Sequence, residues 1–213
     1  METLLSPADA RLVDGLRAHD DRAFEELVRE HGPGMLRVAQ LYVSSRSVAE
    51  EVVQDAWLGV LNGIGRFEGR SSLKTWIYRI LVNNAKTRAV REARSVPFSA
   101  FGDDEEGSSV DPERFHGADE RYPGHWALPP RSWSGAPEAR LLARETLDVI
   151  EREIENLPPA QALVITMRDV EGFDADDVCN ALDISETNQR VLLHRARSRV
   201  RRALEEYMNR DAP

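Results

Sequence analysis

The sequence predicts an all-α protein of two small helical domains, an N-terminal helical bundle and a C-terminal helix-turn-helix domain, joined by a long linker. Apolar residues recur at helical spacing over residues 8–94 and again over 137–208, without the alternation typical of strands. The segment between these stretches loses the period and contains five prolines. With 213 residues, 41% hydrophobic and 31% charged, the chain is long enough for two domains. The expected boundaries are 1–94, 95–136 and 137–213.

Capping residues predict where the N-terminal helices begin. Ser6 and Pro7 are a helix cap and a first helical residue, and the pair Ser47 and Glu50 has the spacing of a capping box. Ser72 is the expected cap of a fourth helix. The expected helices are a short one from residue 7, then 21–43 with an interruption at 32–34, then 47–63 and 73–94.

The C-terminal half has the pattern of a helix-turn-helix. The expected elements are a helix ending before Pro158, a second from Pro159 to about Gly172, a short third opened by Asp174 and Asp177 and ending at Leu182, a tight turn at 183–185 and a long helix from Glu186. Leu193, Ala196 and Val200 are expected to hold the last helix on the core. Arg190, His194 and Arg197 are then left on its other side, where arginine can pair with guanine in the major groove.

Charge is segregated along the chain, although the net charge of −9 disfavours nucleic-acid binding at first sight. Residues 70–94 hold seven basic residues against one acid, and residues 190–202 hold six arginines and no acid. Residues 103–120 hold eight acids against one arginine. Solvated helix faces explain either basic patch alone, but they explain the segregation poorly. Two basic surfaces separated by an acidic connector favour two contacts with nucleic acid.

The fourth helix carries an aromatic ring, an amide and several cations at helical spacing. Trp76, Arg79, Asn83 and Thr87 share a face, beside a stripe expected to be buried that contains Leu73, Ile77, Ile80 and Leu81. Rings and guanidinium groups stack on unpaired bases, and an amide can bond a base edge, so this face suits single-stranded DNA. The alternative for Trp76 is an ordinary core tryptophan. Asparagine is not favoured in the middle of a helix, which makes Asn83 harder to explain structurally.

Six sequence stretches resemble extracytoplasmic-function (ECF) sigma factors. SVAEEVVQDAW (47–57), RFEGR (66–70) and LKTWIYRILVN (73–83) are similar to region 2 of that family. LPPAQALVITMRDVEG (157–172), DVCNAL (177–182) and LHRAR (193–197) are similar to region 4. The resemblance covers about residues 23–94 and 145–207. It departs from the family at Asn188, Gln189 and Leu192 in the recognition helix and at Thr87, so the promoter sequence read does not carry over.

The resemblance implies a function and a set of site residues. It implies that domain 1–94 binds RNA polymerase core and melts the minus-ten element, and that domain 137–213 reads the minus-thirty-five element. The residues expected to face the clamp coiled coil of the polymerase largest subunit are Glu51, Gln54, Asp55 and Trp57. Those expected at the minus-ten element are Phe67, Lys74, Trp76, Arg79, Asn83, Lys86, Thr87 and Arg91. Those expected at the minus-thirty-five element are Ser185, Glu186, Asn188, Arg190, Val191, His194, Arg195 and Arg197.

The partners that follow are the polymerase clamp and flap, promoter DNA and an anti-sigma factor. No catalytic residue, cofactor or metal ligand is expected, because the sequence shows no phosphate-binding glycine loop, zinc spacing or nucleophile–base pair. The single cysteine, Cys179, excludes an internal disulfide and is expected at a core position. The N-terminus lacks a signal-peptide layout and no apolar run approaches the ~20 residues of a membrane span, so a cytoplasmic protein is expected.

Two other functions remain open from the sequence. A helix-turn-helix repressor that works without polymerase would explain the C-terminal half, and it would bind duplex DNA tightly alone. A metal-dependent nuclease could use the carboxylates at 103–106, and it would cleave DNA only with divalent metal. The linker adds a further hypothesis: Trp126 and Trp133 dock on the polymerase, on an anti-sigma factor or on this chain.

Overall fold

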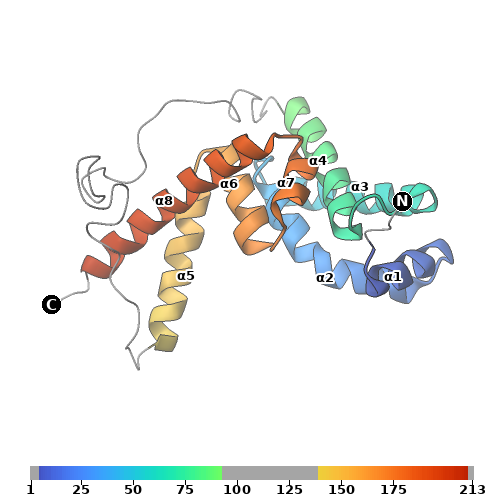
Figure 1. The fold of residues 1–213 in the computed structure, drawn as a ribbon, viewed down its shortest axis with the longest axis horizontal. Coiled ribbons are helices and arrows are strands. Elements are labelled where there is room, and N and C mark those ends of the chain that lie inside the picture. The colour runs from blue at the N-terminus through green and yellow to red at the C-terminus, as the bar shows by residue number, and fades with distance from the viewer. Residues whose placement is uncertain (1–4, 93–138, 211–213) are drawn as a thin grey trace, which may run out of the picture. The chain divides into compact units, whose positions relative to one another are not determined.

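The computed structural model describes residues 5–92 and 139–210, and in these two ranges every regular element is a helix. Figure 1 shows their order along the chain. The first range contains α1 (Pro7–Arg17), α2 (Asp21–Gln40), α3 (Arg46–Gly63), the 3₁₀ turn η1 (Ile64–Arg66) and α4 (Leu73–Arg91). The second contains α5 (Ala139–Glu155), α6 (Pro159–Ile165), the π-helical turn η4 (Thr166–Val170), α7 (Ala175–Leu182) and α8 (Glu186–Arg210). The all-α prediction is confirmed.

The described residues fall into two compact units. One is drawn from Met1–Gly102 and Pro158–Leu193, and the other from Asp103–Leu157 and His194–Pro213. The predicted domain boundaries at 94 and 137 therefore stay predictions, and the linker with Trp126, Trp133 and the acids at 103–106 lies outside the described residues. No helix in the described ranges has the length and apolar character needed to cross a membrane.

Helix α4 is the centre of the first unit. Leu73, Ile77, Tyr78 and Leu81 are fully buried on it, because α2, α3 and α7 all pack against α4. Ile80 was expected in the same stripe but is only half-buried. Burial on several sides leaves α4 one accessible face, and that face carries the candidate site.

Most of the predicted helix starts are confirmed by their caps. In each case a side-chain oxygen accepts an N–H of the first turn, which satisfies a donor that has no partner inside the helix. The bonds are Asp9 N to Ser6 Oγ (3.0 Å), Thr75 N to Ser72 Oγ (3.1 Å), Asp177 N to Asp174 Oδ1 (2.8 Å) and Asn188 N to Ser185 Oγ (3.2 Å).

The capping box predicted at Ser47 is wrong. Helix α3 begins two residues earlier, because Ser45 has an extended backbone and its Oγ accepts the N–H of Val48 at 3.3 Å. Ser47 lies inside the helix, and Glu50 forms an ion pair with Arg46 at 2.9 Å instead of returning to the cap. Either serine can cap a helix, and only Ser47 has a glutamate three residues later, but Ser45 has the extended backbone of the cap.

The predicted interruption of the second helix at residues 32–34 is also wrong, since α2 continues through Pro33. A proline inside a helix costs about 3 kcal/mol. Burial of His31, Met35 and Val38 along α2 offsets that cost. A Cβ on Gly34 would lie 2.3 Å from the hydroxyl oxygen of Tyr78, so glycine is required for the close approach of α4.

The helix-turn-helix prediction is confirmed by the elements that form it. Helices α7 and α8 are joined at Asp183, which has a left-handed backbone (φ 61°). Leu193, Ala196 and Val200 are buried on α8, as predicted. The structure adds the π-helical turn after α6, which precedes a positive φ of 69° at Gly172. Cys179, expected in the core, is half-buried.

Candidate functional site

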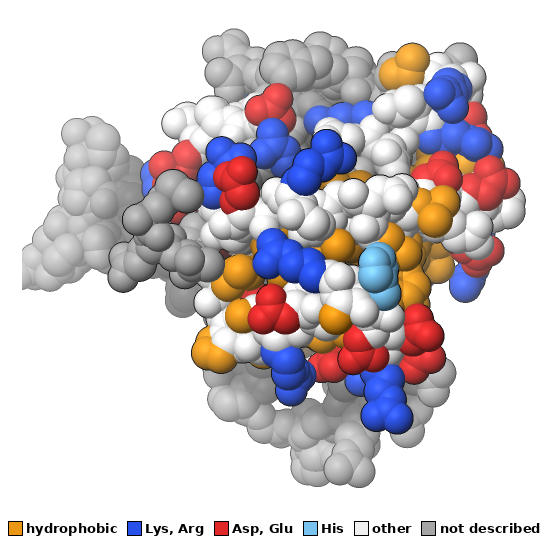
Figure 2. All heavy atoms as spheres, turned by 90° about the vertical axis from the view of Figure 1, so that its right-hand side faces the viewer, with side chains coloured by type: hydrophobic (Ala, Val, Ile, Leu, Met, Phe, Trp, Pro, Cys, Tyr) orange, Lys and Arg blue, Asp and Glu red, His pale blue; other side chains and the backbone are white. Residues whose placement is uncertain are grey.

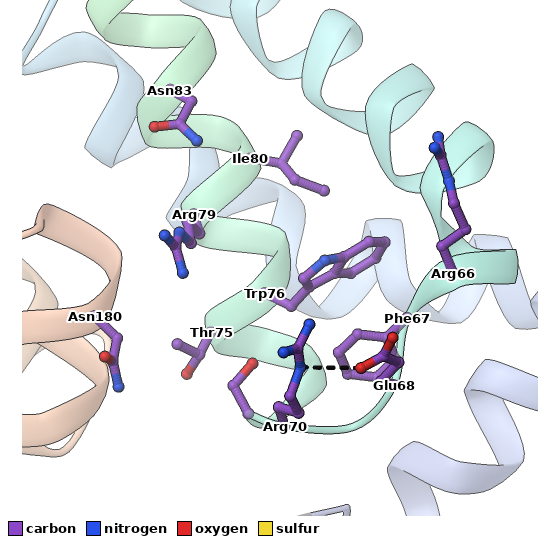
Figure 3. Close-up of a pocket in the computed structure, with 11 residues that line it drawn as sticks. Arg66, Phe67, Glu68, Arg70, Thr75, Trp76, Arg79, Ile80, Asn83 and Asn180 are labelled. Carbon is purple, nitrogen blue, oxygen red and sulfur yellow. Dashed lines mark ion pairs between the residues drawn. The ribbon is translucent and has the colours of Figure 1, made fainter.

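A hollow of about 600 Å³ opens beside the accessible face of α4 (Figure 3). Its walls come from the loop that follows α3, from α4 and from α7. The lining residues are Arg66, Phe67, Glu68, Arg70, Ser71, Thr75, Trp76, Arg79, Ile80, Asn83 and Asn180. Four residues predicted to bind the minus-ten element, Phe67, Trp76, Arg79 and Asn83, thus lie together.

The aromatic wall of this pocket is formed by Phe67 and Trp76. Their ring centroids are 4.8 Å apart and the planes are inclined by 38°. Trp76 also lies against the backbone of α3, because a Cβ on Gly63 would be 3.1 Å from its ring. Phe67 is only 6% exposed, so it supports Trp76 from behind, and the half-buried Trp76 supplies the ring surface facing the pocket.

The polar side of the pocket is formed by Arg79 and Asn83, one turn apart on α4 and both exposed (Figure 3). Asn83 carries two donors and an acceptor, which matches the edge of an unpaired base. Arg79 supplies a permanent positive charge and a planar group that can stack or pair with phosphate. An exposed ion pair between Arg70 and Glu68 lies at the rim, at 3.1 Å. Stacking surface, base-edge partners and cation are therefore within one hollow.

The other residues predicted at the minus-ten element lie outside this pocket. Lys74 Nζ donates to the carbonyl of Glu171 and lies 4.2 Å from the Phe173 ring centroid. Lys86 Nζ donates to the carbonyl of Leu182 at 3.2 Å. The Thr87 hydroxyl donates to the carbonyl of Asn83 at 2.8 Å, and the side chain of Arg91 is exposed.

The segment that these lysines contact is anchored by a partly buried carboxylate. Glu171, whose side chain is 10% exposed, accepts two N–H groups of Arg37 at 2.8 Å and the hydroxyl of Tyr78 at 3.3 Å. Burial and the charge of Glu171 raise the pKa of Tyr78, so the phenol keeps its proton and donates. The rings of His31 and Tyr78 are nearly perpendicular, with centroids 6.5 Å apart, and burial lowers the pKa of His31. These contacts hold residues 171–173 against α2 and α4.

The residues predicted to bind polymerase divide between the surface and the core of α3. Gln54 and Asp55 are exposed, and Glu51 is exposed while it pairs with Arg88 at 2.9 Å. Trp57 differs from the prediction: it is 7% exposed and packs edge-on against Phe24, with centroids 5.7 Å apart. The sequence around Trp57 does not show whether its side chain faces the core or the solvent, and packing against α2 decides that it faces the core. Trp57 supports the helix from inside.

Sequence reasoning missed two leucines on the same face of α3. Leu58 and Leu61 are 58% and 40% exposed, unlike most large apolar residues that the structure describes. They follow Gln54 by four and seven residues, so the three side chains share one face. That spacing was visible in the sequence, but the helical pattern alone assigns leucines to the core. We call Gln54, Asp55, Leu58 and Leu61 the α3 face.

The residues of α8 that were predicted to face away from the core are exposed to solvent. Arg190, His194 and Arg197 are exposed at spacings of four and three residues. Arg190 pairs with Glu186 of the preceding turn at 2.5 Å, and the Ser185 hydroxyl is engaged as the helix cap. Asn188, Val191 and Arg195 are half-buried, and the neighbouring Gln189 is buried.

The surface charge is mixed where Figure 2 displays it. Lys and Arg side chains are interspersed there with Asp and Glu, and apolar side chains are exposed between them. No group of three or more metal-binding side chains occurs in the described ranges. The site is therefore defined by its aromatic and polar lining, without a uniform basic field on the face shown.

Two described ranges built of helices, with a helix-turn-helix and a pocket suited to an unpaired base, have the features of a DNA-binding transcription factor. Residues 27–95 match the family model of Sigma-70 region 2, and residues 147–200 match that of Sigma-70 region 4. The chain belongs to the ECF family of RNA polymerase sigma factors.

Curated relatives match along nearly their whole length. The RNA polymerase sigma-H factor of Pseudomonas aeruginosa is 28% identical over 202 residues, which are 95% of this chain and 96% of the relative. The ECF RNA polymerase sigma-E factor of Escherichia coli is 29% identical over 192 residues, or 90% of this chain and 92% of the relative.

Solved structures share the fold. CnrH, solved in complex with the cytosolic domain of CnrY, has a TM-score of 0.56 at 18% identity, covering 96% of this chain and 99% of CnrH. The sigma factor RpoE, solved with the anti-sigma factor NepR from Bartonella quintana, has a TM-score of 0.54 at 20% identity, covering 85% of this chain and 95% of RpoE.

Proposed function

We propose that this protein, as an ECF sigma factor, brings RNA polymerase core to promoters and captures an unpaired minus-ten base in the pocket of α4. The observation that carries this proposal is the convergence of Trp76, Arg79 and Asn83 on one hollow backed by Phe67. Membership of the sigma-factor family supplies the partners, namely polymerase core and promoter DNA.

The energetics of base capture fit such a pocket. Flipping a base out of a duplex costs a few kcal/mol. Stacking on an aromatic ring returns ~1–3 kcal/mol per base, and hydrogen bonds to Asn83 add to that. Because capture depends on the base being unpaired, the pocket stabilises melted DNA and leaves the closed duplex unaffected.

The α3 face is the proposed docking surface for the polymerase clamp. Two exposed leucines beside an exposed carboxylate offer apolar area with a charge at its edge, the composition of a protein interface. Glu51 belongs to this surface only if its ion pair with Arg88 opens or is shared with the partner.

Helix α8 is the proposed reader of the minus-thirty-five duplex. Support comes from Arg190, which is exposed near the N-terminus of α8, the end by which recognition helices contact base edges, and from His194 and Arg197, which follow on the same face. Ser185, Glu186, Asn188, Val191 and Arg195 complete the proposed contact region. The polymerase flap is the proposed second docking partner of domain 137–213.

The remaining proposals concern regulation and chemistry. An anti-sigma factor is a proposed partner, since CnrH and RpoE, two structures that share the fold, were each solved with a second protein, in one case a named anti-sigma factor. The protein is proposed to act beside polymerase in the cytoplasm and to catalyse no reaction of its own. Lys74, Lys86, Thr87 and Arg91 are proposed to contact the DNA backbone around the pocket.

Run-off transcription tests the function directly. Core polymerase with this protein is expected to give discrete transcripts from a pool of genomic promoter fragments, while either component alone gives none. No stable complex with core would contradict the proposal. Tight duplex binding by the protein alone would favour a repressor, and metal-dependent DNA cleavage would favour a nuclease.

A further inference from the structure

The loop that carries Phe67 is bonded to a helix far away in the sequence. Arg17, the last residue of α1, donates from Nη2 to the carbonyl oxygen of Phe67 at 2.7 Å. Its Nε lies 3.4 Å from the carbonyl oxygen of Ile64 and donates to it. One guanidinium group therefore bridges the start and the end of the turn between α3 and the pocket.

The turn supplies carbonyls that favour a cation. The last carbonyls of a helix lack partners inside it and carry partial negative charge. Ile64 O accepts the N–H of Phe67 at 3.2 Å, which closes the 3₁₀ turn, and Arg17 bonds the same oxygen from outside. The planar fork of arginine can donate to two acceptors at once, whereas the ammonium of lysine is a compact point charge.

The backbone of Phe67 is held on both sides: its N–H donates to Ile64 O at 3.2 Å, and its carbonyl oxygen accepts the bond from Arg17. Gly69, two residues further on, has a positive φ of 68°, which glycine adopts without strain. The ring of Phe67 in turn lies against Trp76, the stacking surface of the pocket. A shift of the Phe67 backbone therefore moves the support of Trp76.

We infer that Arg17 is a positioning residue for the minus-ten pocket: its guanidinium fixes the turn 64–67, which holds Phe67 behind Trp76 for base capture. This inference rests on the proposed function. Arg17 lies outside residues 27–95, the part matched by the region 2 family model. It gives α1 a role in DNA melting without any contact with DNA.

The experiment compares variants of the full-length protein in complex with core polymerase. The readout is permanganate reactivity of minus-ten thymines on a promoter found by the run-off assay. Arg17→Ala is expected to lower open-complex formation about tenfold, the effect of losing charge-assisted hydrogen bonds. Arg17→Lys is expected to restore part of it, since it keeps the charge but not the bridge. Affinity for core is expected to stay unchanged.

The matched control is Arg11→Ala on the same helix, because the exposed Arg11 pairs with the half-buried Glu26 at 3.2 Å and does not touch the turn. It is expected to melt promoters as the unchanged protein does. A double-mutant cycle separates positioning from general stability. In a Phe67→Ala background, Arg17→Ala is expected to add little further loss, because the side chain that it positions is gone.

Two results would overturn the inference. One is equal melting by Arg17→Ala and the unchanged protein, and the other is fully additive losses in the cycle. If Arg17→Ala does not fold, Arg17→Lys decides, and melting equal to the unchanged protein counts against the bridge. Failure of the unchanged protein to melt any promoter would instead contradict the proposed function itself.

Discussion

Asn83 shows how one residue can be placed against local preference. Asparagine is disfavoured in the middle of a helix, yet α4 carries it at an exposed position where its amide faces the pocket. The hydroxyl of Thr87 bonds the Asn83 carbonyl, so the backbone there is held without the amide. None of the contacts described for this helix therefore requires the Asn83 side chain.

We expect Asn83→Ala to impair promoter melting more than duplex binding. Losing its bonds to an unpaired base should cost roughly 1–3 kcal/mol in open-complex stability, measured by permanganate footprinting on a suboptimal promoter. Asn84→Ala is the matched control, because Asn84 is adjacent but does not line the pocket. Equal melting by both variants would remove Asn83 from the site.

His31 gives the fold a defined pH dependence. Burial lowers its pKa, so the unfolded chain binds a proton more readily than the folded chain does. Its contribution to stability is therefore present above pH ~6.5 and is lost as the pH falls below that value. Urea unfolding measures the free energy of unfolding at about pH 7.5 and about pH 5.5. The decrease between these two values should be smaller in His31→Gln than in the unchanged protein. The control His194→Gln, which changes an exposed histidine, should show the same decrease as the unchanged protein.

At the scale of elements, α3 separates stability from docking. Its inner side carries Trp57 against Phe24, and its outer side carries the α3 face. A helix with apolar residues on both sides is expected either in the middle of a protein or at an interface. The exposed Asp55 beside Leu58 favours the interface.

Substitutions on the two sides of α3 should affect different properties, core binding on the outer side and stability on the inner side. Asp55→Ala and Leu58→Ala are expected to weaken core binding with little change in the free energy of unfolding, because both side chains are exposed. Trp57→Ala should cost about 3–5 kcal/mol of stability by leaving a cavity. Affinity for core polymerase and urea unfolding measure the two effects. Unchanged core affinity in Leu58→Ala would contradict the assigned surface.

Helix α8 should show two kinds of DNA contact along its length. Arg190→Ala is expected to cost roughly 1–3 kcal/mol and to relax specificity at one base pair, because its end of the helix reaches base edges. Arg202 is twelve residues further on and pairs loosely with Glu206 at 3.9 Å. Arg202→Ala should reduce affinity for all sequences alike and lower the salt slope. Identical specificity profiles for the two variants would contradict the assigned groove contact.

At the scale of the whole molecule, net charge and DNA binding oppose each other. The chain carries a net charge of −9, which repels phosphate at long range. Two of the cations on α4, Lys74 and Lys86, are already bonded to the carbonyls of Glu171 and Leu182. Both features weaken DNA binding by the protein alone.

We therefore expect the protein alone to bind promoter duplex at least about a hundredfold more weakly than its complex with core polymerase does. Fluorescence anisotropy with a labelled promoter, at low and moderate salt, measures both affinities. Lowering the salt concentration should reduce the ratio of the two affinities only in part, because the net charge of the protein stays negative. Equal affinities would support a repressor that needs no polymerase.

The local part of the structure was predictable from the sequence. The caps at Ser6, Ser72, Asp174 and Ser185 depend on bonds within three residues, so the sequence contains all of the participants. The failures at Ser47 and Pro33 have the opposite origin. At Ser47, a second serine two residues earlier takes the cap. At Pro33, burial of side chains along α2 outweighs the local cost of a proline inside the helix.

By itself, the sequence determined the all-α class, the helix-turn-helix and the residues of the pocket face on α4, because helical period and capping act within a few turns. Only the tertiary structure decided that Trp57 and Phe67 face inward, that Leu58 and Leu61 face outward, and that Arg17 bonds the turn beside the pocket. The Arg17 bonds join residues 47 and 50 positions apart, and Trp57 packs on Phe24, which lies on another helix. No pattern along the chain encodes which of those distant partners meet.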